Sequence, residues 1–254
     1  MLVSMTQGRR AVTDAGPGVA SGRAEPTTSR PIASLALWPF VELARRHGLE
    51  VDELAELAGM RVTDLRDPGM RCAQPEANRL ADLVCARAGE DCGIRAAETL
   101  EAGHFALFEL LARTAPTVGQ ALAQAGRFFS LIHSEVRLAY RVEPDATHII
   151  RTVVPDGLAI HDAYGQLAFA AFTINLRRET EHADMAPLDV WFRQVEPRDR
   201  SSFERVLGKQ LRFGMPEDRM RFSPETAALP LTRKNPTVHA AAVQAATDFL
   251  RTHK

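Results

Sequence analysis

The chain has 254 residues, of which 45% are hydrophobic and 25% charged, and its 31 basic and 32 acidic side chains give a formal net charge of −1. These fractions are typical of a globular protein and exclude collagen-like, coiled-coil and wholly disordered chains. The balanced charge also argues against a dedicated nucleic-acid-binding protein, because neutralisation of phosphates supplies most of the affinity of such proteins.

The first 31 residues are rich in Gly, Pro, Ser, Thr and Ala and lack the apolar core of a secretory signal. Residues 1–31 are therefore predicted to be a disordered tail, and residues 32–254 a folded domain. No segment approaches the ~18–20 apolar residues that a membrane-spanning helix requires. The spacing of Cys72, Cys85 and Cys92 is not that of a disulfide framework. We therefore expect buried reduced thiols in a cytoplasmic protein.

The ordered sequence begins with helical patterns. Apolar residues recur at helical spacing over 34–47, 51–58 and 62–66, and Gly48 and Gly59 stand where a helix end favours a left-handed residue. Pro75 occupies a first-turn position of a longer helix, and a short helical piece is expected within 92–100. The N-terminal third is thus predicted to be helical.

The middle of the chain changes from helical to strand periodicity. Residues 104–114 are apolar nearly all round, which predicts an interior helix, and Thr117 with Gln120 forms a capping box that begins the next helix. Alternation over 136–142 and again over 148–154 predicts a β-hairpin with a turn at Pro144. Residues 160–182 form the longest and least charged helical pattern, which predicts the central helix of the domain.

The last part of the chain is predicted to add short elements and a final helix. Leu188, Val190 and Phe192 indicate a third strand, and a helix is expected over 198–207, followed by short strands around the 214–218 turn. Asn235 and Pro236 are typical of a helix start, and an apolar stripe continues from there to the C-terminus. The predicted class is α+β, with a helical N-terminal third followed by a small antiparallel sheet packed against long helices.

Motifs of known catalytic or cofactor sites are absent from the sequence. There is no nucleophile elbow, phosphate-binding loop or dinucleotide fingerprint, and the eight histidines lack metal-ligand spacing. His161 and Asp162 are adjacent, but neighbours on a helix point ~100° apart and cannot bond to each other. The sequence predicts no enzyme, no metal and no cofactor.

A ligand pocket is the functional alternative to simple packing for the histidines and aromatic residues of this region. Small-molecule pockets are mostly apolar with a few oriented polar groups. The candidate pocket residues, expected between the sheet and the helices, are His104, Phe105, Phe108, Phe128, His133, His161, Tyr164 and Trp191. The other interpretation, that these side chains only pack in the core, stays open.

One segment imitates a DNA-binding helix-turn-helix. Residues 51–58 and 62–66 are two short helical patterns with Gly59 at the turn. However, residues 50–67 carry six acids against two arginines, Arg61 and Arg66, so both flanks would repel phosphates. We therefore expect a structural role for this segment, and direct DNA binding through it is a secondary alternative.

Several segments together resemble the N-terminal effector domain of AraC-type transcription regulators, in the arabinose-binding-like subgroup. The resemblance rests on Gly48-Leu-Glu-Val-Asp-Glu-Leu-Ala-Glu-Leu-Ala-Gly-Met60, Leu65-Arg-Asp-Pro68, Cys92-Gly-Ile-Arg95, the stretch from Gly103 to Leu122, and the closing Leu211-Arg-Phe-Gly214, Met220-Arg-Phe222 and Leu229-Pro-Leu231. These motifs extend over about Ala33 to Phe249, and their order and spacing carry more weight than any one of them.

The resemblance implies a cytoplasmic, non-enzymatic sensor of a small-molecule effector that forms a homodimer and controls a DNA-binding module. Members of the family usually continue for about a hundred residues with two helix-turn-helix motifs, and this sequence stops at Lys254, where that module would be attached. The expectation is an effector domain without its own DNA-binding module. The alternative from another class is a ligand-free interaction module that partners full-length regulators.

Overall fold

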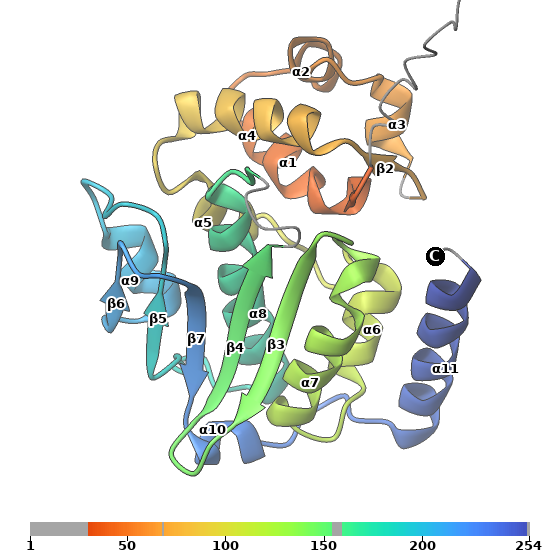
Figure 1. Ribbon diagram of the computed structural model, residues 1–254, viewed down its shortest axis with the longest axis vertical. Helices are drawn as coiled ribbons and strands as arrows, with labels where there is room; N and C mark the ends of the chain where they lie inside the picture. The colour runs from red at the N-terminus through yellow and green to blue at the C-terminus, as the bar shows by residue number, and fades with distance from the viewer. Residues whose placement is uncertain (1–29, 68, 154–158, 253–254) are drawn as a thin grey trace, which may run out of the picture.

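The computed structural model describes residues 30–67, 69–153 and 159–252, so most of the predicted N-terminal tail lies outside the described residues. The N-terminal part consists of β1 (Ile32–Ala33), the 3-10 helix η1 (Ser34–Ala36), α1 (Trp38–Arg46), α2 (Val51–Ala58), α3 (Val62–Arg66), β2 (Arg71–Cys72), α4 (Gln74–Ala88) and α5 (Cys92–Ala97). Helices α1 to α4 form a layer at the top of Figure 1, here called the N-terminal layer, and α5 lies below them beside α8.

The remaining elements build a sheet and its covering helices. They are α6 (Ala106–Arg113), α7 (Val118–Phe128), the 3-10 helix η2 (Phe129–Leu131), β3 (Val136–Val142), β4 (Thr147–Val153), α8 (Ala163–Thr180), β5 (Asp189–Trp191), α9 (Ser201–Leu207), β6 (Leu211–Arg212), β7 (Asp218–Phe222), α10 (Pro224–Ala228) and α11 (Pro236–Thr252). The predicted α+β class is confirmed.

Several helices begin or end where glycine, proline or a capping residue predicts it. Gly48 and Gly59 adopt positive φ angles of 79° and 72° after α1 and α2, a conformation that costs glycine little. Pro75 lies in the first turn of α4, and the Thr117 hydroxyl accepts a hydrogen bond from the Gln120 amide at 3.3 Å. The helical N-terminal third is thereby confirmed.

The larger sheet has five strands in the order β3-β4-β7-β5-β6. Pairing is antiparallel except between β5 and β6, which run parallel because α9 carries the chain across between them. The sheet is therefore mixed rather than wholly antiparallel, and β6 and β7 lie on either side of β5 instead of pairing around their turn. The antiparallel pair β1–β2 in the N-terminal part was not predicted.

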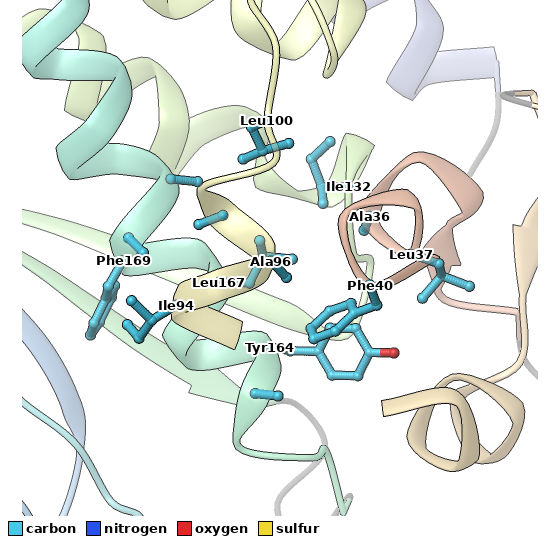
Figure 2. Packing of buried hydrophobic residues seen from close by; sticks show 14 of the residues in the cluster. Ala36, Leu37, Phe40, Ile94, Ala96, Leu100, Ile132, Tyr164, Leu167 and Phe169 are labelled. Atoms are coloured by element: carbon cyan, nitrogen blue, oxygen red, sulfur yellow. The ribbon is translucent and has the colours of Figure 1, made fainter. Parts of the chain in front are cut away.

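Helix α8 is the central helix, as its composition predicts, and it is buried along most of its length. It packs between the sheet and α5, and Gly93 of α5 approaches so closely that an added Cβ would lie 2.1 Å from the Ala163 carbonyl oxygen. Figure 2 shows Tyr164 of α8 against Phe40 of α1, with ring centroids 5.0 Å apart. This edge-on contact, worth about 0.5–1.5 kcal/mol, joins the N-terminal layer to the rest of the fold.

The expectation of three reduced thiols is wrong for two of the cysteines. Cys85 on the last turn of α4 and Cys92 at the start of α5 form a disulfide, with their Cα atoms 5.2 Å apart. The tight reversal between the two helices brings together residues whose sequence spacing matches no standard motif. Cys72 is free and buried, and burial raises the pKa of its thiol to about 11.

Helix α6 is less enclosed than its apolar composition predicts. Phe108 and Leu111 are buried, but Leu110 is 40% exposed, and Phe105 and Leu107 are half-buried. Helix α11 packs beside α6 and buries only Ala242 and Ala246. The two helices, at the right of Figure 1, therefore leave apolar side chains such as Leu110 partly exposed.

Candidate ligand-binding site

A groove of about 800 Å³, here called the outer groove, lies between the start of α6, η2, the β1–β2 region and the end of α11. Its volume is within the usual range for small-molecule sites. Most of its walls are apolar; its described lining residues are Arg30, Ala33, Leu35, Gly69, Met70, Arg71, Phe105, Ala106, Leu107, Phe108, Ser130, Leu131, Ile132, Ser134, Phe249 and Leu250.

Two smaller spaces of about 60 Å³ each lie further inside. The first inner cavity lies between α6, α7 and α8, and the second lies between α6, η2, α8 and the start of β3. Apolar side chains again form most of the lining. The charged and polar exceptions are Glu109, Arg113, Asn175 and Glu179 in the first cavity, and His133 and Arg151 in the second.

Phe105 and Phe108 line all three spaces, so their rings form the boundary between the outer groove and the inner cavities. Ala171 and Phe172 of α8 line both inner cavities. We call the combination of outer groove and inner cavities the groove–cavity site.

The backbone that presents the two phenylalanines is strained. Ala106 has a φ angle of 47°, in the left-handed region, and Gly103 has a φ of 92°. Such a conformation costs an L-residue about 1–2 kcal/mol. The Glu109 carboxylate holds this segment by accepting hydrogen bonds from the amides of Gly103, at 2.6 Å, and Phe105, at 3.4 Å. The boundary of the groove–cavity site is thus a strained segment fastened by one carboxylate.

Arg113 connects that carboxylate to α8. Its Nη1 donates to Glu109 at 3.3 Å and its Nε lies 2.8 Å from Glu179, with all three side chains largely buried. Burial raises the pKa of the Glu179 carboxyl against the opposing influence of Arg113. This cluster closes one end of the first inner cavity and links α6 to α8.

His133, a candidate pocket residue, lines the second inner cavity with both ring nitrogens occupied. Its Nε2 donates to the Gln74 side-chain oxygen at 2.7 Å, and its Nδ1 accepts from the Glu135 amide at 3.2 Å. Burial, reinforced by the nearby Arg151 and Arg71, lowers the pKa of His133 to about 3. The ring is therefore neutral near pH 7 and offers the cavity carbon atoms rather than a donor.

The other polar groups of the second inner cavity are also satisfied internally. The Tyr164 hydroxyl donates to the Ala77 carbonyl oxygen at 2.6 Å. Arg151 forms a buried ion pair with Asp218 at 2.8 Å between Nη1 and Oδ2. Such a pair is costly to break, because a lone buried charge would remain. The lining of the second inner cavity is therefore mainly apolar, and its polar groups have partners within the protein.

Of the eight candidate pocket residues, Phe105, Phe108, His133 and Tyr164 line the groove–cavity site and four lie elsewhere. His104 adjoins the site, with Nε2 2.8 Å from the Leu35 carbonyl oxygen. The remaining three are Phe128, buried under the Arg127 guanidinium; His161, whose Nε2 is 3.3 Å from Asp82; and Trp191, on β5 beneath Arg219.

The groove also contains residues that no sequence pattern marked as candidates for the site. Arg71 was not predicted because its environment is assembled from segments some 40 and 60 positions away in the sequence, as its bonds to the Arg30 and Leu131 carbonyls show. Phe249 and Leu250 on α11 carried only the signal of an apolar stripe, and that stripe is part of the groove wall rather than of the core.

The helix-turn-helix-like segment corresponds to α2 and α3. Helix α2 buries Leu54, Ala55 and Ala58 in the N-terminal layer, and α3 has only five residues. The arginines that would contact phosphates are engaged, because Arg61 pairs with Asp64 at 2.7 Å and Arg66 pairs with Asp52 at 2.9 Å. This pairing of the arginines and the net acidic charge of residues 50–67 both argue against phosphate binding by the segment.

Membrane-spanning helices and metal clusters are both absent from the described ranges. None of the described helices is both long and apolar enough to span a bilayer. Within the same ranges, His, Cys, Asp and Glu side chains do not gather in any group of three that suits a metal ion.

Comparisons with known proteins point to one family. The family model described as the arabinose-binding domain of AraC transcription regulator, N-terminal, matches residues 48–231. The crystal structure of the transcriptional regulator CdpR from Pseudomonas aeruginosa is similar in fold, with a TM-score of 0.52 at 13% identity over 79% of this chain and 61% of that chain. This chain thus spans less than two thirds of CdpR. No curated protein matches the sequence.

Proposed function

The chain belongs to the family of arabinose-binding N-terminal domains of AraC transcription regulators, and on that premise we propose that it senses a small, largely apolar effector in the groove–cavity site. The family comprises effector-binding domains of regulators and not enzymes. The observation that carries the proposal is the outer groove of about 800 Å³, separated from two inner cavities by Phe105 and Phe108.

The signal would pass from the site to α11. This helix contributes Phe249 and Leu250 to the outer groove and is tied to the end of α6, where the Asn235 amide donates to the Thr114 carbonyl at 3.0 Å and Thr114 Oγ1 lies 3.2 Å from His239 Nδ1. An effector that binds one arrangement of α6 and α11 more tightly shifts the population toward it. A tenfold response requires about 1.4 kcal/mol of differential affinity.

We further propose that the protein acts in the cytoplasm as a homodimer, and that DNA is contacted by a part of the regulator other than α2 and α3. The exposed Leu110 on α6 and Val238 on α11 support pairing through this side of the molecule. The ion-paired Arg61 and Arg66 support a non-binding role for the α2–α3 segment. Native mass spectrometry should detect two subunits; a purely monomeric species at micromolar concentration would contradict the dimer.

A ligand screen on two variants tests the proposed function. Amino acids, sugars and medium-chain acids, alcohols and amines are screened at millimolar concentration by thermal shift. We expect at least one compound to raise the melting temperature of the wild type, and Ala171→Phe, which fills the space shared by the inner cavities, to remove that shift. Ala245→Phe on the exposed face of α11 is the matched control and should keep it.

Because overpacking alone costs about 1–3 kcal/mol, the ligand-induced shift is compared rather than the melting temperature itself. Circular dichroism establishes that each variant is folded. If no compound in the panel stabilised the wild type, the sensing function would be wrong. An undiminished shift in Ala171→Phe would contradict the participation of the inner cavities.

A further inference from the structure

The charged side chains that line the outer groove are basic. Among its described lining residues two are arginines, Arg30 and Arg71, and none is a carboxylate. Arg30 has a carboxylate partner, the buried Asp64 at 2.6 Å, which it shares with Arg61. Arg71, in contrast, is the arginine of the groove whose contacts within the described residues include no carboxylate.

Arg71 is held by neutral acceptors alone within the described residues. Its Nε donates to the Arg30 carbonyl at 3.1 Å and Nη1 to the Leu131 carbonyl at 3.2 Å, while Nη2 is directed at the carbonyls of Pro31 and Ser130. A guanidinium has five N–H donors, so these contacts leave one hydrogen on Nη1.

Partial burial without a carboxylate is unfavourable for a guanidinium. Desolvation lowers the pKa of Arg71, whereas Arg30, which has a carboxylate partner, shows a raised pKa. An anion in the groove would compensate the Arg71 charge and accept its remaining hydrogen. The adjacent walls, formed by Leu131, Ile132 and the boundary rings, favour an apolar chain.

We propose that the ligand of the outer groove is an amphipathic monoanion, with a carboxylate or similar group beside Arg71 and an apolar chain directed along Leu131 and Ile132 toward Phe105 and Phe108. This inference rests on the proposed function and narrows it to one class of effector. A neutral or cationic molecule with the same chain satisfies the walls but leaves the guanidinium without a counter-charge.

Three ligands that differ only in the head group test the charge requirement on the unmodified protein. Octanoate, 1-octanol and octylammonium are titrated by isothermal calorimetry at 50 mM and 500 mM NaCl. We expect octanoate to bind with a Kd at least about tenfold lower than that of 1-octanol, and octylammonium to bind more weakly than 1-octanol. The octanoate advantage should shrink at the higher salt concentration, because ions screen the attraction.

Variants then assign the charge to one residue. Arg71→Gln should abolish the preference for octanoate over 1-octanol, and Arg71→Lys should retain most of it. Arg87→Gln removes the same charge from an exposed position outside the groove and should leave the preference intact. The wild-type ligand comparison stands even if Arg71→Gln does not fold, since Arg71 also ties four backbone carbonyls together.

The outcomes separate the two proposals. Equal affinity for octanoate and 1-octanol, or tighter binding of octylammonium, would overturn the anionic class while leaving the sensing function in place. Stabilisation by another member of the wider panel, with no binding of octanoate, would do the same. If every compound of that panel failed on the wild type, the proposed function itself would be refuted.

Discussion

The depressed pKa of His133 predicts a specific loss of stability in mild acid. In the folded protein this pKa is about 3, against 6.5 for an unperturbed histidine. Below pH 6.5 the unfolded chain therefore binds a proton that the folded protein does not, so His133 contributes stability that is complete above pH 6.5 and is lost as the pH falls toward 3. At pH 5 the loss amounts to about 2 kcal/mol, a value that any folded pKa below about 4 reproduces.

Urea unfolding at pH 8 and pH 5, followed by tryptophan fluorescence, measures this loss. His133→Gln keeps a donor for Gln74 but cannot titrate, and the carboxyl groups contribute equally to both proteins. We expect the decrease in the free energy of unfolding between pH 8 and pH 5 to be about 2 kcal/mol larger in the wild type than in the variant. An identical decrease in the two proteins would refute the neutral, buried state assigned to His133.

Two further predictions concern strain and thiol chemistry. Ala106→Gly should raise the free energy of unfolding by about 0.5–1 kcal/mol, because the φ angle of Ala106 is 47° and its methyl group is exposed. Ala245→Gly in the right-handed helix α11 should lower the free energy of unfolding by about 1 kcal/mol. Thermal unfolding measures both changes, and a lower stability in both variants would contradict the strain. Thiol titration of protein purified under non-reducing conditions and then denatured should find one reactive thiol per chain, and three after reduction, because Cys85 and Cys92 are paired; three thiols before reduction would contradict the pairing.

Signals confined to a few neighbouring residues could be predicted from the sequence. The ends of α2 follow from its apolar spacing and the glycine at position 59, and the low charge of residues 163–180 indicates a helix buried on most sides. Alternation predicts the β3–β4 hairpin because successive side chains in a strand point to opposite faces. In each case the cause of the structure lies within the segment.

Features that depend on distant segments could not be predicted in this way. The parallel pairing of β5 and β6 depends on the path of the chain through α9, and the exposure of α6 depends on how little of it α11 covers. The sequence places Phe105 and Phe108 in an apolar segment, but their position at the boundary of three spaces depends on how distant segments pack around them. No local pattern marked Arg71, since its partners lie some 40 and 60 positions away in the sequence.

A diffraction experiment with 8-bromooctanoate tests the central claim most directly, because bromine is located by its anomalous scattering. The account predicts a bromine peak at the boundary formed by Phe105 and Phe108 or within an inner cavity, with the carboxylate beside Arg71. A saturated complex whose bromine lies on another surface, with the groove and both inner cavities unchanged, would contradict it.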